Sequence, residues 1–450
     1  MKTKKYILSG SVPHMARLLG TLIGLHIGAW ASAQTIGIQG NAPDYAGVTF
    51  RFYAYNDYIT YTEDLIMQCT VAADGSFAAT GTLTHEGMIF ARTGTYFLYF
   101  YAVPNADYTL YPPPRKEKSK TDSLNLFFEE TPIHVGTHTT AANDINRTMM
   151  DGDCPSAANT AGTSYFAYCR YRQGLEKYRS VKQKVKSLAI HYFRNQPILY
   201  YNEAYMDLFN QVYNRYFEFM QRDEAQLLDI INRERNLPQL KAFILRDTTF
   251  RDDALLELVM LKNLYENFYT PTFSHESLLS LVKAVAQTTL YAENKNIAQN
   301  IINRVTLLMA GYTPPDFTLY DTAGAAYHLA DFRGKALYLI FGKVFSYVSI
   351  NAFEKLFTPY NVYHDAIEIV VVSVDEDTAQ LQEFCRNERY RWHFLHYGDN
   401  PDVLKKYNIS VLPTYFLLDK EGKLLLSPAP SPFGDIEQVF KQLHNKANRQ

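Results

Sequence analysis

The last third of this 450-residue chain alternates short apolar runs with helical stretches, and this order constrains the fold more than any other feature. The apolar runs are rich in β-branched and aromatic residues, as in strands that are buried on both faces. Strands are predicted at 336–341, 367–374, 414–418 and 423–427, and helices at 349–356, 378–387 and 435–444. Because helices separate the first strands, the order predicts a central sheet with helices on both sides.

Short motifs follow one another through the same segment. They are Pro315-Asp316-Phe317-Thr318-Leu319, Gly324, Gly334-Lys335, Val372-Ser373-Val374-Asp375, Tyr407-Asn408-Ile409 and Leu412-Pro413-Thr414. In order and spacing, residues 311–450 resemble the exported thiol-disulfide oxidoreductases of the thioredoxin-like, cytochrome-maturation type. The resemblance implies an α/β thioredoxin-like fold here. Family members from Gram-negative envelopes often add an N-terminal β-module and a helical middle domain.

The cysteines of that family are missing. In its active members Trp-Cys-x-x-Cys opens a helix, where N–H groups and the helix dipole stabilise a thiolate. Counted from Phe341, Ser346 and Ser349 occupy the two cysteine positions. Ile340 stands where redox-active thioredoxins place a buried acidic or polar residue. Since a hydroxyl has no disulfide chemistry, the resemblance implies a degenerate member without catalytic residues.

The resemblance also implies a retained binding surface. Leu412-Pro413 matches the family's cis-proline loop, which lies beside the active site and pairs with an extended substrate backbone. A peptide or envelope protein is then the expected partner, bound by strand addition. The expected binding residues are Phe345, Ser346, Tyr347, Ser349, Leu412, Pro413 and Thr414. Two plainer explanations stay open: Pro413 preserves a turn that the fold needs, and Ser346 caps a helix.

Two further domains are predicted before residue 311. Over residues 34–136 the pattern has a period of two, which predicts a β-sandwich-like module. In one such run Val48, Phe50, Phe52 and Ala54 alternate with Thr49, Arg51, Tyr53 and Tyr55. The proline-rich segment 112–118 is expected to be an exposed loop. Over residues 140–309 the period is near 3.6, which predicts a helical domain. One helix face is predicted to hold Ile198, Tyr201, Tyr205, Leu208, Phe209, Val212 and Tyr216.

The N-terminus predicts export. Three lysines precede an apolar run at 18–30, and Ala31-Ser32-Ala33 is a small-x-small cleavage site, so residues 1–33 are expected to be a signal peptide. A retained anchor is the alternative, although the run is short for a membrane span. No transmembrane span is expected after signal removal. With the resemblance, export indicates the periplasm or cell envelope of a Gram-negative bacterium.

The chain contains four cysteines, none in C-x-x-C spacing: Cys69, Cys154, Cys169 and Cys385. In an oxidising compartment Cys154 and Cys169 are candidates for a structural disulfide. The same pair gives the rival hypothesis, a thiol-disulfide oxidoreductase that uses cysteines outside the usual motif. Cys385 follows Leu381 and Phe384 on a predicted helix, and we expect its side chain to be buried there as a small apolar group.

Composition and motifs disfavour other classes of function. A net charge of -2, from 44 basic and 46 acidic side chains, provides no field that attracts nucleic acid. Paired metal-ligand histidines, a glycine-rich phosphate loop and G-x-S-x-G are all missing, so neither a metal nor a cofactor is expected. Non-catalytic binding or scaffolding is the function that we expect. The sequence leaves the oligomeric state open.

Overall fold

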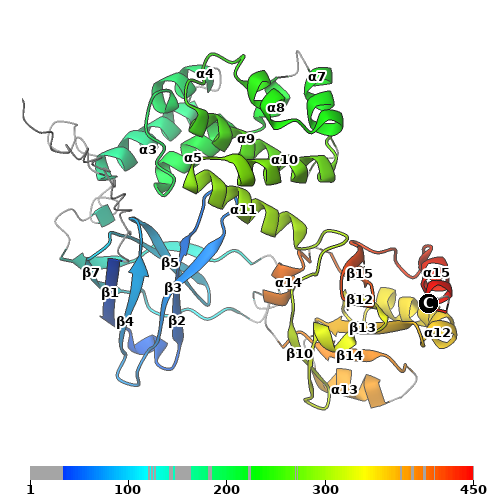
Figure 1. Cartoon of the computed structure of the whole chain (residues 1–450). Helices are drawn as coiled ribbons and strands as arrows, with labels where there is room; N and C mark the ends of the chain where they lie inside the picture. Colours follow the sequence, from blue (N-terminus) through cyan, green and yellow to red (C-terminus); the bar gives the residue numbers. More distant parts are fainter. Residues whose placement is uncertain are drawn as a thin grey trace, which may run out of the picture.

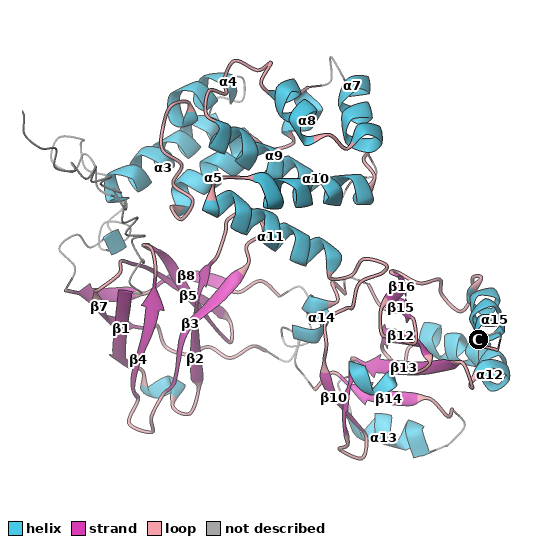
Figure 2. Cartoon of the chain, viewed as in Figure 1, coloured by secondary structure: helices cyan, strands magenta, loops and turns pink. Residues whose placement is uncertain are grey.

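The computed structural model describes most of the chain from residue 34 onward (Figure 1). The described residues are 34–119, 122, 125, 128–140, 145–146, 164–180, 185–220, 224–268, 270, 272–375, 378–386, 390–398, 402–409 and 411–448. The predicted signal peptide, residues 1–33, and Cys154 lie outside these ranges. Strands come first along the chain, then helices, then a region that mixes both (Figure 2).

Within the described part of residues 34–140, the strands form two sheets. One has the order β4-β1-β7-β9 and the other the order β3-β2-β5-β6-β8. The strands are β1 (Gln34–Asn41), β2 (Thr49–Tyr55), β3 (Glu63–Thr70), β4 (Ser76–Leu83), β5 (Gly87–Thr93), β6 (Tyr96–Ala102), β7 (Asp107–Tyr111), β8 (Thr131–His134) and β9 (Gly136–Thr139), with a 3-10 turn η1 (Pro43–Tyr45). Since β9 pairs with β7, this sheet continues past residue 136.

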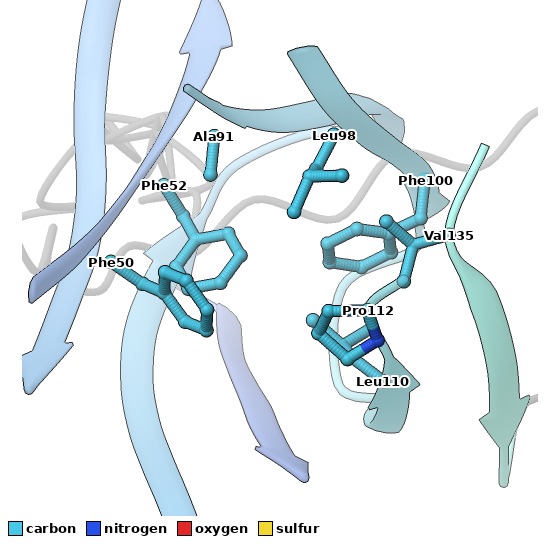
Figure 3. Close-up of a pocket in the computed structure, with 8 residues that line it drawn as sticks. All are labelled: Phe50, Phe52, Ala91, Leu98, Phe100, Leu110, Pro112 and Val135. Carbon is cyan, nitrogen blue, oxygen red and sulfur yellow. The ribbon is translucent and has the colours of Figure 1, made fainter. Parts of the chain in front are cut away.

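Apolar side chains from both sheets meet between them. The predicted alternation in β2 is confirmed, because Phe50 and Phe52 are buried while Arg51 between them is exposed. These two rings and Leu110 of the other sheet line a small cavity without polar walls (Figure 3). Pro112 also lines it, so the loop that we predicted to be exposed begins half-buried. Its ring is apolar and it has no N–H that needs a partner.

Helices occupy the middle of the chain. They are α3 (Ser164–Ser180), α4 (Val185–Leu188), α5 (Glu203–Val212), α6 (Tyr216–Phe219), α7 (Glu224–Asp229), α8 (Leu237–Ile244), α9 (Asp253–Asn267), α10 (His275–Thr288) and α11 (Ala292–Thr306), with π-helical turns η2 (Ala189–Phe193) and η4 (Ile230–Glu234). Every residue of α9 from Ala254 to Leu264 is buried. A helix that is buried on all sides lies at the centre of its domain, and the other helices surround α9 in Figure 2.

The predicted continuous helix face over 198–216 is wrong at both ends. The Asn202 side chain accepts the Tyr205 N–H at 3.0 Å, which caps α5 and starts it only at residue 203. Arg215 adopts a left-handed conformation, with φ of 51°, and separates α5 from α6. The buried face of α5 therefore keeps only Tyr205, Leu208, Phe209 and Val212 of the predicted set.

The β2–β3 loop joins the strand region to the helices. Tyr58 and Ile59 of this loop are buried within the hydrophobic core of the helical region. The Asn210 side chain donates to the Tyr58 carbonyl oxygen at 2.9 Å, and the Asn300 side chain donates to the Asp57 carboxylate at 2.8 Å. These contacts connect the two regions through buried aromatic packing and charge-assisted hydrogen bonds.

Glu203, the first residue of α5, lies at the same contact. It is half-buried and close to the hydroxyls of Tyr58, Tyr101 and Tyr168. Burial is the main cause that raises the pKa of the Glu203 carboxyl to about 7; the nearby Asp207 adds to this shift and Arg172 opposes it.

The C-terminal region is a seven-stranded sheet, among the described residues, in the order β11-β10-β14-β13-β12-β15-β16. Its elements are β10 (Thr318–Asp321), β11 (Ala326–His328), η5 (Leu329–Phe332), β12 (Ala336–Gly342), α12 (Tyr347–Tyr363), β13 (Ile367–Ser373), α13 (Thr378–Arg386), β14 (His393–His396), α14 (Asp402–Lys406), β15 (Thr414–Leu418), β16 (Leu424–Leu426) and α15 (Ile436–Ala447). Apolar cores lie on both faces, with alternate β12 side chains in each. The predicted two-sided sheet is confirmed.

The sequence pattern did not predict β10, β11, β14 or α14, and the helix predicted at 349–356 is shorter than α12. His393 begins β14 and packs against the rings of Tyr327 and Phe332. In α12 the helix continues through Pro359 to Tyr363. Within the part of the chain that the structure describes, no helix has the length and apolar character needed to cross a membrane.

We predict that Glu203→Gln stabilises the protein above neutral pH. The folded state holds the Glu203 proton more tightly than the unfolded chain does. The contribution of this proton to the free energy of unfolding is therefore largest near pH 4, and it is lost as the pH rises to about 7. Near pH 8 the variant should gain about 2 kcal/mol, allowing for partial solvent screening, and melt a few degrees above the wild type. Circular dichroism melts at both pH values measure this.

The matched control is Glu176→Gln, which changes an exposed carboxylate on α3. It should melt like the wild type at both pH values. An equal gain for Glu203→Gln near pH 4 and pH 8 would contradict the titration that we assign to Glu203.

Candidate functional site

Ser346 and Ser349 lie at the start of α12. Ser346 has an extended conformation, and its Oγ accepts the Ser349 N–H at 3.1 Å. The Ser346 hydroxyl also donates to Ser349 Oγ at 2.9 Å, and Ser349 is only 2% exposed. The explanation of Ser346 as a helix cap is therefore confirmed. The Ser346 hydroxyl thus acts as both donor and acceptor within the first turn of α12.

Asp375 fixes the loop between β12 and α12. Its Oδ2 accepts the Val344 N–H at 2.6 Å and the Ser373 hydroxyl at 2.7 Å. The Asp375 carbonyl oxygen accepts a hydrogen bond from His396 Nε2 at 2.8 Å. Asp375 and Val344 are both buried. A buried carboxylate that accepts two hydrogen bonds positions the backbone that leads to Ser346.

The Leu412–Pro413 peptide bond is cis, and it lies beside Ser349. A Cβ atom at Gly342 would be 3.4 Å from Ser349 Oγ and 3.5 Å from Pro413 Cβ, so both side chains border the same point. The structure thus brings the serines and the proline loop together. The Thr414 hydroxyl donates to the Val411 carbonyl oxygen at 2.5 Å and closes this turn.

The backbone of Leu412 has no partner within the described residues. The β12–β15 ladder ends at the Phe341–Thr414 pair, and no turn or loop hydrogen bond uses the N–H or the C=O of Leu412. Leu412 is half-buried rather than fully solvated. An unpaired N–H and C=O next to the end of a strand ladder can pair with an added strand.

Several large apolar side chains of α12 and of nearby loops are exposed. Tyr347 is 82% exposed, Val411 67% and Phe433 56%, and Phe345, Val348 and Ile350 are also exposed. Tyr347, Val348 and Phe433 line one shared hollow. Exposed apolar residues that gather in this way are typical of an interaction site.

The site has no machinery for nucleophilic or metal chemistry among the described residues. Neither serine hydroxyl is hydrogen-bonded to a histidine or a carboxylate that could remove its proton. A search of the described residues also finds no group of three or more His, Cys, Asp and Glu side chains that could hold a metal ion.

The cysteines lie in other environments. Cys169 on α3 is disulfide-bonded and 5% exposed. Cys69 and Cys385 are free, and burial raises the pKa of both thiols, which disfavours the reactive thiolate. Cys385 is half-buried and packs against the apolar core under α12. Cys154 lies outside the described residues, so its pairing with Cys169 stays a prediction.

Comparisons with known proteins match the C-terminal region. The AhpC/TSA family model matches residues 310–426. The thiol-disulfide oxidoreductase ResA of Geobacillus thermodenitrificans is 32% identical over 149 residues, which are 33% of this chain and 80% of that protein. ResA of Geobacillus kaustophilus is 32% identical over 143 residues, 31% of this chain and 81% of that protein.

The chain belongs to the thioredoxin-like thiol-disulfide oxidoreductase family. Among solved structures, a thiol:disulfide interchange protein from Bacteroides sp. is 26% identical and covers 31% of this chain and 91% of its own, with a TM-score of 0.28. A thioredoxin-like protein from Bacteroides caccae covers 64% of this chain and 98% of its own, at 16% identity and a TM-score of 0.32.

Three residues of this family member's site were not predicted as site residues. Asp375 ends the Val372-Ser373-Val374-Asp375 motif, and an acidic residue directly after a buried strand was the available signal. Val411 is next to the predicted Leu412. Phe433 comes from the segment before α15, and its sequence context gives no sign that it lies near α12.

We predict that Asp375→Ala destabilises the C-terminal region by about 2 kcal/mol, because the buried Val344 N–H loses a charged acceptor. Trp392 is the only tryptophan after residue 33. Its fluorescence in the chain without residues 1–33 therefore reports urea unfolding of this region. Glu421→Ala, which removes an exposed carboxylate from the β15–β16 turn, is the control and should not shift the transition.

We predict that Cys169 pairs with Cys154. Peptide mapping of the purified protein without reductant should give a cross-linked peptide that contains both residues, and reductant should release it. A link from Cys169 to any other cysteine would contradict this pairing.

Proposed function

We propose that this protein is an exported, non-catalytic thioredoxin-like protein of the cell envelope that binds an extended peptide or protein segment. Residues 1–33 would direct export, and residues 311–450 would carry the binding groove between Ser346 and Pro413. The β-sandwich-like module, 34–136, and the helical domain, 140–309, would act as a scaffold. The observation that carries the proposal is a pair of hydroxyls beside a cis-proline loop in which the Leu412 backbone has no partner among the described residues.

The hydroxyl pair supports binding without exchange. Disulfide exchange needs a thiolate that attacks and a sulfur that leaves, and Ser346 and Ser349 supply neither. Their hydrogen bond instead closes the helix terminus, since the Ser346 hydroxyl donates to Ser349 and accepts its N–H. We infer that these residues stand at the family's cysteine positions and keep the shape of the site after the loss of its chemistry.

The link between the helical and thioredoxin-like regions supports a scaffolding role. The Gly311 N–H donates to the Leu424 carbonyl oxygen at 2.7 Å, and the Leu424 N–H donates to the Tyr312 carbonyl oxygen at 2.9 Å. Lys283 of α10 donates to the Tyr312 hydroxyl at 3.1 Å. The chain that leaves α11 pairs with β16. The thioredoxin-like region is therefore attached to the helices by these hydrogen bonds as well as by the covalent chain.

The rival function, an oxidoreductase that uses Cys154 and Cys169, has less support. A redox-active cysteine must be reached by the disulfide of its substrate, and Cys169 is buried within the helical region. Cys169 is already disulfide-bonded, as expected of a structural cross-link in an exported protein.

We predict that the wild type does not accelerate insulin reduction by dithiothreitol, since neither hydroxyl can exchange with a disulfide. The double variant Ser346→Cys, Ser349→Cys should gain this activity, because it restores two sulfurs at the start of α12. The turbidity of precipitating insulin measures the rate.

Ser427→Cys together with Ser431→Cys, placed before α15, is the matched control and should stay inactive. Wild-type activity that disappears in Cys154→Ala, Cys169→Ala would overturn the proposal in favour of the rival function.

A further inference from the structure

We propose that the groove selects extended segments that carry a bulky aromatic side chain, which enters a hollow between Tyr347 and Phe433. This inference rests on the proposed function, because it names the class of segment that the same groove binds. The occupant is a peptide strand in which one aromatic side chain supplies most of the selectivity.

The hollow lies between α12 and the segment that precedes α15. Its lining consists of Tyr347, Val348, Asn351, Glu354, Lys355 and Phe433. The α12 members recur at steps of three and four residues, so they form one stripe along the helix. The two helices are in contact, and Figure 1 shows α12 and α15 side by side at one end of the region. Phe433, from the segment before α15, completes the lining.

The two ends of the hollow differ in chemistry. Tyr347, which is 82% exposed, is next to Ser346 at the start of α12, and the lining also holds the ring of Phe433, which is 56% exposed. At the other end Glu354 and Lys355 provide charges of opposite sign. The Tyr390 hydroxyl donates to the Glu354 carboxylate at 3.0 Å and orients it. Two ring faces favour an aromatic guest, because offset or edge contacts add to the apolar area that it buries.

The unpaired backbone of Leu412 indicates why the occupant is a strand. A bound helix would use its own N–H and C=O groups internally, and it would leave those of Leu412 without partners. An extended segment can pair with them and still direct alternate side chains to one side. Tyr347 is the first residue of α12, directly after Ser346, so a side chain that leaves the paired strand toward α12 meets the hollow at its apolar end.

The full chain can be tested with two fluorescein-labelled decapeptides of Ser, Thr and Gly that differ only in a central Trp or Ser. Fluorescence anisotropy should give at least roughly tenfold tighter binding of the Trp peptide, as expected when one aromatic anchor fills a pocket. In Phe433→Ser and Tyr347→Ser the ratio of the two affinities should fall to about one or two, because the Trp peptide loses its anchor and so loses more affinity than the Ser peptide.

Val362→Ser is the matched control, because Val362 is also 56% exposed but lies at the far end of α12. It should keep the wild-type ratio, and melting temperatures should show that all three variants are folded. If the wild type binds both peptides equally, the inference fails and the proposed function stands. If it binds neither peptide, both fail. If the wild type binds no peptide and forms a dimer, and Phe433→Ser dissociates that dimer, then the hollow binds a second copy of the chain.

Discussion

The central position of β12 determines how the site is assembled. This strand is buried on both faces and is hydrogen-bonded on both sides, to β13 in parallel and to β15 antiparallel. The register places Thr414 opposite Phe341 and Ser373 opposite Gly342. The ends of three strands therefore meet where β12 ends. The serine loop, the cis-proline turn and Asp375 are brought together by main-chain pairing before any side chain of the site interacts.

Local hydrogen bonds then give the site a defined shape without reactive groups. Asp375 anchors the Val344 N–H, and Ser346 caps α12. Each of these contacts satisfies a polar group that would otherwise be unpaired at the end of a strand or a helix. Because these contacts need only oxygen and nitrogen atoms, the geometry of a thioredoxin-like site does not depend on sulfur. The binding role that we propose for this site needs no sulfur at these positions.

The regions before residue 311 are joined to this site by a continuous series of contacts. Tyr58 extends from the strand region into the core of the helical region, where α9 is buried on all sides. The chain that leaves α11 pairs with β16 through Gly311 and Tyr312. Glu203 lies among tyrosines at the first of these contacts, so the packing between strands and helices is linked to the protonation of one carboxyl.

The sequence alone determined the central strands of the C-terminal sheet, because buried strands such as 336–341 and 414–418 have an apolar pattern that local sequence dictates. It also determined that hydroxyls stand at Ser346 and Ser349, where the resemblance to the family implies cysteine positions. Only the tertiary structure decided which residues border the groove. Phe433 reaches α12 through the packing of α15, and the backbone of Leu412 has no partner within the described chain because the ladder ends at Thr414. The break between α5 and α6 at Arg215 is a change of backbone conformation, which the spacing of apolar residues does not reveal. Contacts between segments distant in the chain depend on register and helix packing, and these are set by the whole core rather than by any local pattern.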